Sequence, residues 1–172
     1  MEKIRLDVMG VSKPRRGESM AKLFAKNCEL AGVTGSNATL IEGLTGVWDA
    51  SVRVSHHFLT EDDIARLRPL VSKALQEIPL LLVAVAEGRA IGFMGIDGDK
   101  IEMFFVTPAS MGQGVGSALM CMATLMADIH RVDVNEQNPS ARAIYEHWGF
   151  RVYERSEVDD QGNPFPILRM SR

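Results

Sequence analysis

Three glycines at alternate positions, Gly112, Gly114 and Gly116, stand between an apolar segment and a segment rich in Ala, Leu and Met. Glycine lets the backbone curl and approach a ligand closely. If a helix begins here, its first turn leaves amide N–H groups without intrahelical partners, and such amides bind phosphate. The alternative is a connection whose glycines are incidental. We favour an anion-binding loop.

Comparison with known phosphate-binding patterns excludes some classes of phosphate ligand for this loop but does not identify one. A P-loop needs a Lys after its last glycine, and here Ser117 follows directly. The pattern G-x-G-x-x-G fails from Gly112 and from Gly114, because its third glycine would fall at Ser117 or Leu119. Asp133, 21 residues after Gly112, suits a ribose-binding acid. Antiparallel strands predicted upstream oppose a Rossmann unit, so a nucleotide-binding α/β domain is the less favoured alternative.

Two strings in the second half of the chain carry a family resemblance. FFVTPASMGQGVG resembles the acetyl-CoA signature of the GNAT superfamily of N-acetyltransferases, R/Q-x-x-G-x-G/A with V-x-P before it. NEQNPSARAIYEHWGF resembles the family's closing segment, with an Asn before the last long helix, a Tyr within it and W/L-G-F at its end. The resemblance covers residues 40–170. Within it, the later half of the chain resembles a bacterial subgroup of small acetyltransferases. Residues 1–39 resemble no known segment and are expected to replace or elaborate the family's first strand.

The resemblance implies how acetyl-CoA would bind as a cosubstrate. In similar enzymes the loop amides take the pyrophosphate of coenzyme A, and the preceding strand, here Phe104–Val106, pairs its backbone with the pantetheine arm. The N–H of Phe104, beside a bulge, would polarise the thioester carbonyl. Asn138 matches the Asn that touches the cofactor arm. The implied cofactor-binding residues are Phe104, Phe105, Val106, Met111, Gly112, Gln113, Gly114, Val115, Gly116, Ser117, Asn138, Ala141 and Tyr145.

One position departs from the family pattern. Met111 stands where the family usually has Arg or Gln, and a Met side chain donates no hydrogen bond. A hydrogen bond to a charged group contributes about 1.5–3 kcal/mol, so we expect an affinity for coenzyme A about tenfold lower or more. A weakened site suits a further alternative, a non-catalytic GNAT-like sensor of coenzyme A, whereas Tyr145 and Glu102 favour an enzyme.

The implied chemistry is direct attack of a neutral amine on the thioester, which needs a base for the amine and an acid for the departing thiolate. Tyr145 matches the family's Tyr and is the expected acid, unless it is only packed on its helix. Glu102, one of few charges in an apolar stretch, is the expected base, unless it simply faces solvent. His56 and His57 lie where similar enzymes often shape the acceptor pocket, yet such a pair is more often structural or on the surface. Asp133 has two possible roles, which stay open: it lines the side of the site where the acceptor binds, or it caps its strand.

The elements that position these residues follow from periodicity and turn signals. Leu80 to Ala86 is continuously apolar, as in a strand buried on both faces. Gly92 and Gly95 in the next strand indicate a bulge or a close backbone approach. Thr60 caps a helix, and so does Asn138. The full prediction is strands at 3–8, 80–86, 90–96, 100–106, 131–135, 150–158 and 165–170, helices at 18–30, 39–55, 61–78, 117–128 and 138–148, and breaks at 12–17 and 32–37.

From residue 80 the predicted order is β-β-β-loop-α-β-α-β-β, and hairpins followed by a crossover imply a mixed sheet. Together with the resemblance this predicts an α/β (α+β) protein with the GNAT fold, a mixed, mostly antiparallel central sheet flanked by helices. At 172 residues we expect one domain, residues 1–172. The methionines at 120, 122 and 126 are read as core rather than interface, and a monomer or a homodimer is expected.

Composition bounds the partners. A net charge of −3 with interspersed signs offers no basic stripe for nucleic acid. Cys28 and Cys121 lie far apart and form no metal-ligand pattern, so we expect reduced cysteines and no metal. The start lacks the apolar segment of a signal peptide and no apolar run is long enough to span a membrane, so we expect a cytoplasmic protein. The acceptor is expected to be a small-molecule or peptide amine, and its identity stays open.

Overall fold

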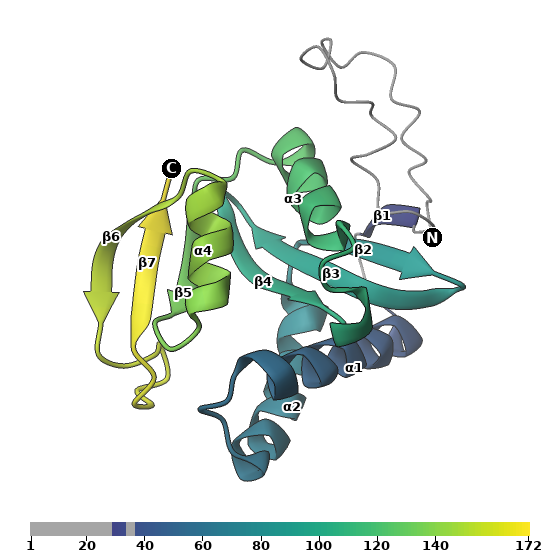
Figure 1. Cartoon of the computed structure of the whole chain (residues 1–172). Helices are drawn as coiled ribbons and strands as arrows, with labels where there is room; N and C mark the ends of the chain where they lie inside the picture. Colours follow the sequence, from purple (N-terminus) through teal and green to yellow (C-terminus); the bar gives the residue numbers. More distant parts are fainter. Residues whose placement is uncertain (1–28, 34–36) are drawn as a thin grey trace.

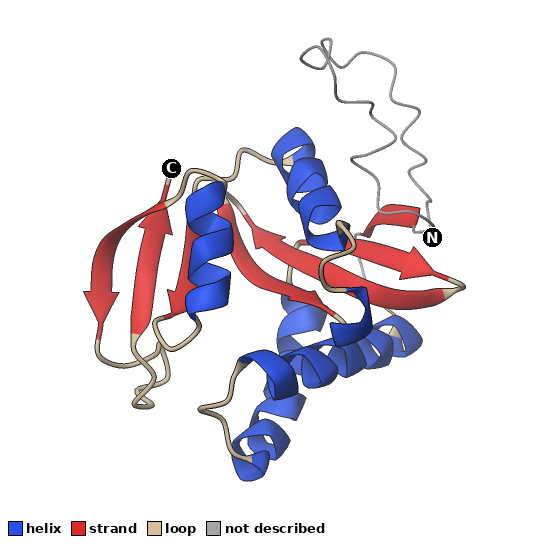
Figure 2. Ribbon diagram, viewed as in Figure 1, coloured by secondary structure: helices blue, strands red, loops and turns tan. Residues whose placement is uncertain are grey.

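The computed structural model describes residues 29–33 and 37–172. They form one seven-stranded sheet with helices on both faces (Figures 1 and 2). The elements are β1 (Glu29–Val33), α1 (Ala38–Ser55), α2 (Glu61–Glu77), β2 (Leu80–Ala86), β3 (Arg89–Asp97), β4 (Lys100–Val106), the 3-10 turn η2 (Pro108–Ser110), α3 (Val115–Met126), β5 (Arg131–Asn135), α4 (Pro139–His147), β6 (Arg151–Ser156) and β7 (Ile167–Ser171). The strand order is β1-β2-β3-β4-β5-β7-β6, and only β4 and β5 are parallel. The predicted mixed, mostly antiparallel sheet flanked by helices is therefore confirmed.

The sheet separates two hydrophobic cores. On one face α1 and α2 pack against it, with Leu44, Trp48, Leu75 and Phe93 fully or nearly fully buried. On the other face α3 and α4 cover a core that includes Met120. Figure 2 shows α1 and α2 gathered on one side, away from α4. Each helical layer thus buries its apolar residues against one face of the same sheet.

Strand β2 illustrates why the apolar run forms a central strand. Leu82 and Ala84 belong to the core under α3, whereas Leu81 and Val83 belong to the core over α1 and α2. Both faces of the strand are buried, so polar residues would lack partners on either side. The prediction of a strand buried on both faces is confirmed.

The predicted special roles of two glycines in β3 are also confirmed. A Cβ built on Gly95 would lie 2.5 Å from Ile78 Cδ1, and one on Gly92 would lie 3.2 Å from the backbone oxygen of Phe105. The register of β3 against β4 shifts at Gly95, and that of β2 against β3 shifts opposite Gly92. Close approach and irregular pairing therefore coincide here.

The predicted helix over residues 18–30 is wrong at its end. Glu29 and Leu30 lie in β1, which pairs antiparallel with β2, and Gly32 lies inside this strand rather than in a break. A Cβ on Gly32 would lie 3.2 Å from Met126 Cε, so this glycine permits a close contact with α3. Helical spacing cannot reveal that the free edge of β2 offers ladder partners to this segment. The remainder of that helix, the predicted strand at 3–8, the loop at 12–17 and Cys28 lie outside the described residues.

Smaller differences concern element ends. Helix α3 begins at Val115 and ends at Met126, rather than running over 117–128, and β6 covers only Arg151–Ser156. Met120 and Met122 are buried in the core and Met126 packs against it, so the core interpretation of these methionines holds. No described helix is long and apolar enough to cross a membrane.

Candidate active site

The two halves of the sheet part between β4 and β5. These strands pair only at Lys100 with Arg131 and Ile101 with Val132, the first residues of each. Beyond them the strands separate, and Figure 1 shows α4 standing in front of the opening. A cleft of about 100 Å³ lies there, lined by β4, β5 and α4 together with His56. A larger hollow of about 400 Å³ between α1 and α2 contains none of the residues expected to carry chemistry.

The free edge of β4 offers backbone groups to this cleft. Thr107 N donates to Ile91 O at 2.8 Å, so at this position the backbone of β4 faces β3. Because alternate residues of an antiparallel strand point the same way, Phe105 also faces β3, and the N–H and C=O of Phe104 and Val106 face the opposite side. That side is the one β5 has left. A ligand with amide groups could pair there as an added strand.

A bulge in β4 sets Glu102 apart. Gly95 pairs with Met103 and Ile96 with Ile101, so Glu102 is an extra residue without an opposite partner. Ile101 and Met103 consequently lie in opposite cores, although they are only two residues apart. The bulge re-aims the Glu102 side chain toward the cleft, which it lines.

The loop after β4 has the backbone of an anion site. Gly112 and Gly114 adopt φ of 72° and 85°, and Gly114 is the N-cap of α3. The amides of Val115, Gly116 and Ser117 lie in the first helical turn and lack intrahelical acceptors. Within the described part of the chain, no acceptor is found for the amides of Gly112 and Gly114 either. These donors, at the positive end of the helix, suit a phosphate group.

Two loop side chains take no part in this cradle. Met111 is 44% exposed. Gln113 donates its side-chain amide to the backbone oxygen of Ala109 at 2.6 Å, which braces the loop. An anion at this loop would therefore depend on backbone amides.

Tyr145 projects from α4 into the cleft. It is 6% exposed, with its ring centroid 5.8 Å from that of Phe150 and 6.4 Å from that of Phe104. No protein partner for its hydroxyl is found among the described residues, and none of their buried side-chain polar atoms is left unpartnered, so this hydroxyl reaches the open cleft. Burial raises the pKa of Tyr145, which keeps the phenol protonated.

Asn138 and Ala141 begin α4 at the same cleft. Asn138 is 7% exposed, and its Oδ1 accepts from Ala141 N at 3.1 Å as the helix N-cap. The cap fixes the side chain, so its amide NH₂ group remains as a donor at the cleft. The first turn of α4 is thereby tied to the site.

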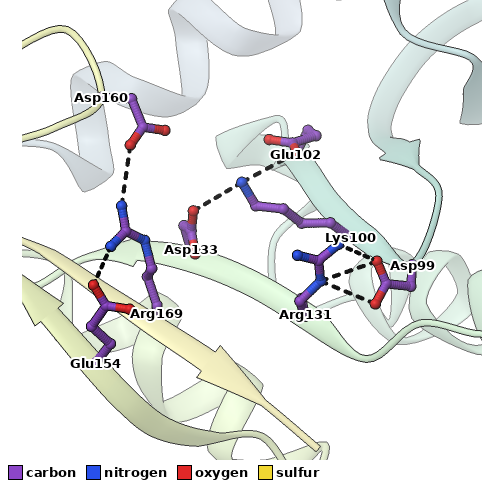
Figure 3. A network of polar contacts seen from close by, with 8 residues as sticks. All are labelled: Asp99, Lys100, Glu102, Arg131, Asp133, Glu154, Asp160 and Arg169. Carbon is purple, nitrogen blue, oxygen red and sulfur yellow. Dashed lines mark hydrogen bonds and ion pairs between the residues drawn. The ribbon is translucent and has the colours of Figure 1, made fainter.

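A chain of ion pairs crosses the point where the strands part (Figure 3). Lys100 Nζ lies 2.9 Å from Asp133 Oδ2 on β5 and 3.2 Å from Glu102 Oε1 on β4. Burial alone would lower the pKa of Lys100, but the two carboxylates outweigh it and the pKa lies above its usual value. The ammonium thus stays charged and holds both carboxylates at the cleft.

His56, the last cleft residue, comes from the end of α1. Its ring lies 6.3 Å from that of Phe105 and 5.3 Å from that of Phe58, which in turn lies 5.6 Å from the ring of Phe165. Burial, with a smaller contribution from His57, lowers the pKa of His56 to about 4. His57 is exposed and does not line the cleft.

The structure brings most of the expected residues to one place. Glu102, Tyr145, Phe104, Phe105, Asn138 and Ala141 all line the cleft. The loop lies at the end of β4 and is continuous with it through Val106 and η2. Sequence reasoning missed Lys100, although its position two residues before Glu102 was a usable signal.

The nucleotide-binding alternative finds no matching arrangement. The glycine loop follows the last strand of an antiparallel meander, not the first strand of a parallel unit. Asp133 is engaged with Lys100. No group of three or more potential metal ligands occurs among the described residues.

Comparison with known proteins gives concordant matches. A family model described as an acetyltransferase (GNAT) domain matches residues 54–171. The peptidyl-lysine N-acetyltransferase YjaB of Salmonella typhimurium is 39% identical over 129 residues, which cover 75% of this chain and 89% of that protein. YjaB of Escherichia coli is 38% identical over 130 residues, covering 76% and 88%.

Solved structures agree. The solution structure of apo YjaB from Escherichia coli superimposes with a TM-score of 0.73 at 38% identity and covers 83% of this chain and 97% of that one. The PaiA N-acetyltransferase of Thermoplasma acidophilum, solved in complex with coenzyme A, gives a TM-score of 0.63 at 18% identity and covers 85% and 99%. At that identity the likeness concerns the fold alone.

Proposed function

The chain belongs to the GNAT acetyltransferase family, and from that premise we propose that it moves the acetyl group of acetyl-CoA to the side-chain amine of a peptidyl lysine. That the protein is an acetyltransferase acting on an amine follows from the family and its relatives. The lysine acceptor is our extension from YjaB, whose name states that acceptor. The observation that carries the proposal is the parting of β4 and β5 beside the glycine loop.

In the proposed complex, acetyl-CoA lies along the loop and the open strand edge. Its pyrophosphate takes the free amides of the loop from Gly112 to Ser117. Its pantetheine arm lies along the open edge of β4 and pairs with the backbone of Phe104 and Val106. The side-chain amide of Asn138 donates to the same arm from α4. The thioester then reaches the cleft that Glu102 and Tyr145 line.

The reaction is direct transfer within a ternary complex. The neutral amine attacks the thioester carbonyl carbon, a C–N bond forms and the C–S bond breaks. The N–H of Phe104 stabilises the negative oxygen of the tetrahedral intermediate. The carboxylate of Glu102 takes the proton lost by the amine, directly or through water, and the hydroxyl of Tyr145 donates a proton to the coenzyme A thiolate.

The chemistry of the cleft supports a lysine acceptor. Glu102 and Asp133 both pair with the ammonium of Lys100 and line the cleft, so two carboxylates are at hand for an incoming cation. The aromatic rings of Phe104 and Phe105, which line the cleft, offer apolar contact for an aliphatic stem. Together they suit a long alkyl chain that ends in an amine.

The test has two steps. Calorimetry should give binding of acetyl-CoA and none of NAD. Incubation with acetyl-CoA and lysine-containing peptides, followed by mass spectrometry, should then show one acetyl group on the lysine side chain. Binding without transfer to any amine in a broad screen would favour the coenzyme A sensor. Binding of NAD in place of acetyl-CoA would contradict the proposal altogether.

A further inference from the structure

A short relay at the end of α1 determines which nitrogen of His56 carries a proton. Ser55 Oγ lies 2.8 Å from the backbone oxygen of Ser51 and 2.8 Å from His56 Nδ1. A hydroxyl has one proton, and a carbonyl oxygen can only accept, so that proton is donated to Ser51. Ser55 Oγ must then accept from Nδ1–H. The other ring nitrogen, Nε2, therefore carries a lone pair.

This lone pair is available in the cleft. Within the described residues Nε2 has no protein partner, and none of their buried side-chain nitrogens or oxygens is unpartnered, so Nε2 is reached by solvent. The ring lines the cleft and is held between Phe58 and Phe105. Because its pKa is lowered to about 4 by burial, the imidazole is neutral at physiological pH.

Nε2 of His56 lies where it can accept a hydrogen bond from the attacking amine. Glu102, Phe104 and Tyr145 line the same cleft from β4 and α4, whereas His56 enters it from α1. An attacking amine must direct its lone pair at the thioester, so one of its N–H groups needs an acceptor on another side. A neutral imidazole with a fixed tautomer supplies such an acceptor.

We propose that His56 orients the acceptor amine by accepting a hydrogen bond at Nε2, with Ser55 holding the tautomer. This role rests on the proposed acetyl transfer and adds a residue to it. His56 does not keep the amine proton, which passes to Glu102. Its contribution is the angle of attack and the binding of the acceptor.

The kinetic test uses neighbouring histidines as a matched pair. His56→Phe keeps an aromatic ring between Phe58 and Phe105 but removes the lone pair. With a lysine peptide as acceptor we expect kcat/KM to fall about 30-fold or more, through both kcat and the KM of the peptide, while calorimetry gives an unchanged affinity for acetyl-CoA. His57→Phe, at an exposed position outside the cleft, should leave all three values unchanged. A kcat/KM of His56→Phe within threefold of the wild type would overturn the role.

The tautomer is tested without relying on turnover. Two-bond ¹H–¹⁵N correlation spectra of the wild type should show the Nδ1–H form of His56, and Ser55→Ala should yield a mixture of both forms. With coenzyme A bound, addition of Nα-acetyl-lysine methylamide should move the Nε2 signal of the wild type. An Nε2–H form in an enzyme that acetylates lysine would overturn this role alone. A wild type that transfers no acetyl group would overturn the proposed function and the role with it.

Discussion

The hydroxyl of Tyr145 combines two properties that a proton donor needs. Its ring is fixed between Phe104 and Phe150, and its oxygen still faces the cleft. Burial raises its pKa, so the phenol keeps its proton at physiological pH and can offer it to the coenzyme A thiolate as that group departs. A tyrosine that only filled the core would have its hydroxyl paired with a protein group.

Replacing Tyr145 by Phe removes this proton and keeps the ring. General acid catalysis contributes about 10²–10⁴-fold, so we expect kcat for lysine acetylation to fall by about 100-fold, with little change in thermal stability. Steady-state kinetics with a thiol-trapping reagent measures this. Unchanged turnover in Tyr145→Phe would assign the proton donor to water.

The lowered pKa of His56 makes stability depend on pH. The unfolded chain takes up a proton near pH 6.5 and the folded chain only near pH 4, so stability falls as pH drops through that window. The full shift corresponds to about 3 kcal/mol, and because the ring keeps partial solvent access we expect about 1–2 kcal/mol. Urea denaturation at pH 7 and pH 4.5 measures the loss. In His56→Phe the loss should be smaller by that amount, and an equal loss in both proteins would refute the assignment.

At the scale of elements, the glycine loop and α3 form a cradle made of backbone. Gly114 is both the helix N-cap and a residue with positive φ, where side chains are strained. Gly116 lies so close to Phe104 that an added Cβ would be 3.3 Å from its ring. The loop therefore ties the helix start to the strand that carries the open edge.

We expect Gly114→Val to weaken acetyl-CoA binding at least tenfold, because a β-branched residue resists a φ of 85° and its change displaces the loop amides. Calorimetry gives the affinity. Gly98→Val is the control, since Gly98 has a φ of 57° in the turn between β3 and β4, away from the loop. Both variants should lose stability, and only Gly114→Val should lose affinity.

Met111 offers a gain-of-affinity experiment. Its side chain is exposed beside the loop and contributes no donor. Met111→Arg restores a hydrogen bond to phosphate worth about 1.5–3 kcal/mol, so the Kd for acetyl-CoA should fall about tenfold or more. Met111→Leu should leave it unchanged. If Arg also has no effect, residue 111 does not face the pyrophosphate.

At the scale of the whole molecule, the cleft is a seam between two parts of the sheet. Lys100 bridges the seam with Asp133 on β5 and Glu102 on β4, and beyond Ile101 and Val132 the two strands do not pair. A cofactor that contacts β4, the loop and α4 would supply the missing connection. Ligand binding and stability should therefore be linked.

We expect acetyl-CoA at 100 times its Kd to stabilise the folded protein by about 2.7 kcal/mol, and thereby to raise the midpoint of thermal denaturation by several degrees. NAD at the same concentration should not. Differential scanning calorimetry measures both. Gly114→Val should lose the shift, and a shift that persists in this variant would place the ligand elsewhere.

The sequence alone determined the features that depend on local chemistry. The glycine spacing predicted the loop, the apolar run Leu80–Ala86 predicted a doubly buried strand, and Thr60 and Asn138 predicted caps that the structure contains. Such signals succeed because periodicity and turn residues act within a few positions. The strand at Glu29–Val33 escaped detection because its partner, β2, lies some fifty residues away.

Only the tertiary structure decided how these elements make a site. The parting of β4 from β5, the bridge from Lys100 to Asp133, the bulge at Glu102 and the meeting of His56 with Tyr145 across one cleft all depend on which strands become neighbours. The sequence identifies the residues that can carry chemistry, because residue type and short spacings do not depend on the fold. Distances and tautomers arise from packing between segments far apart in the chain, and no local pattern encodes them.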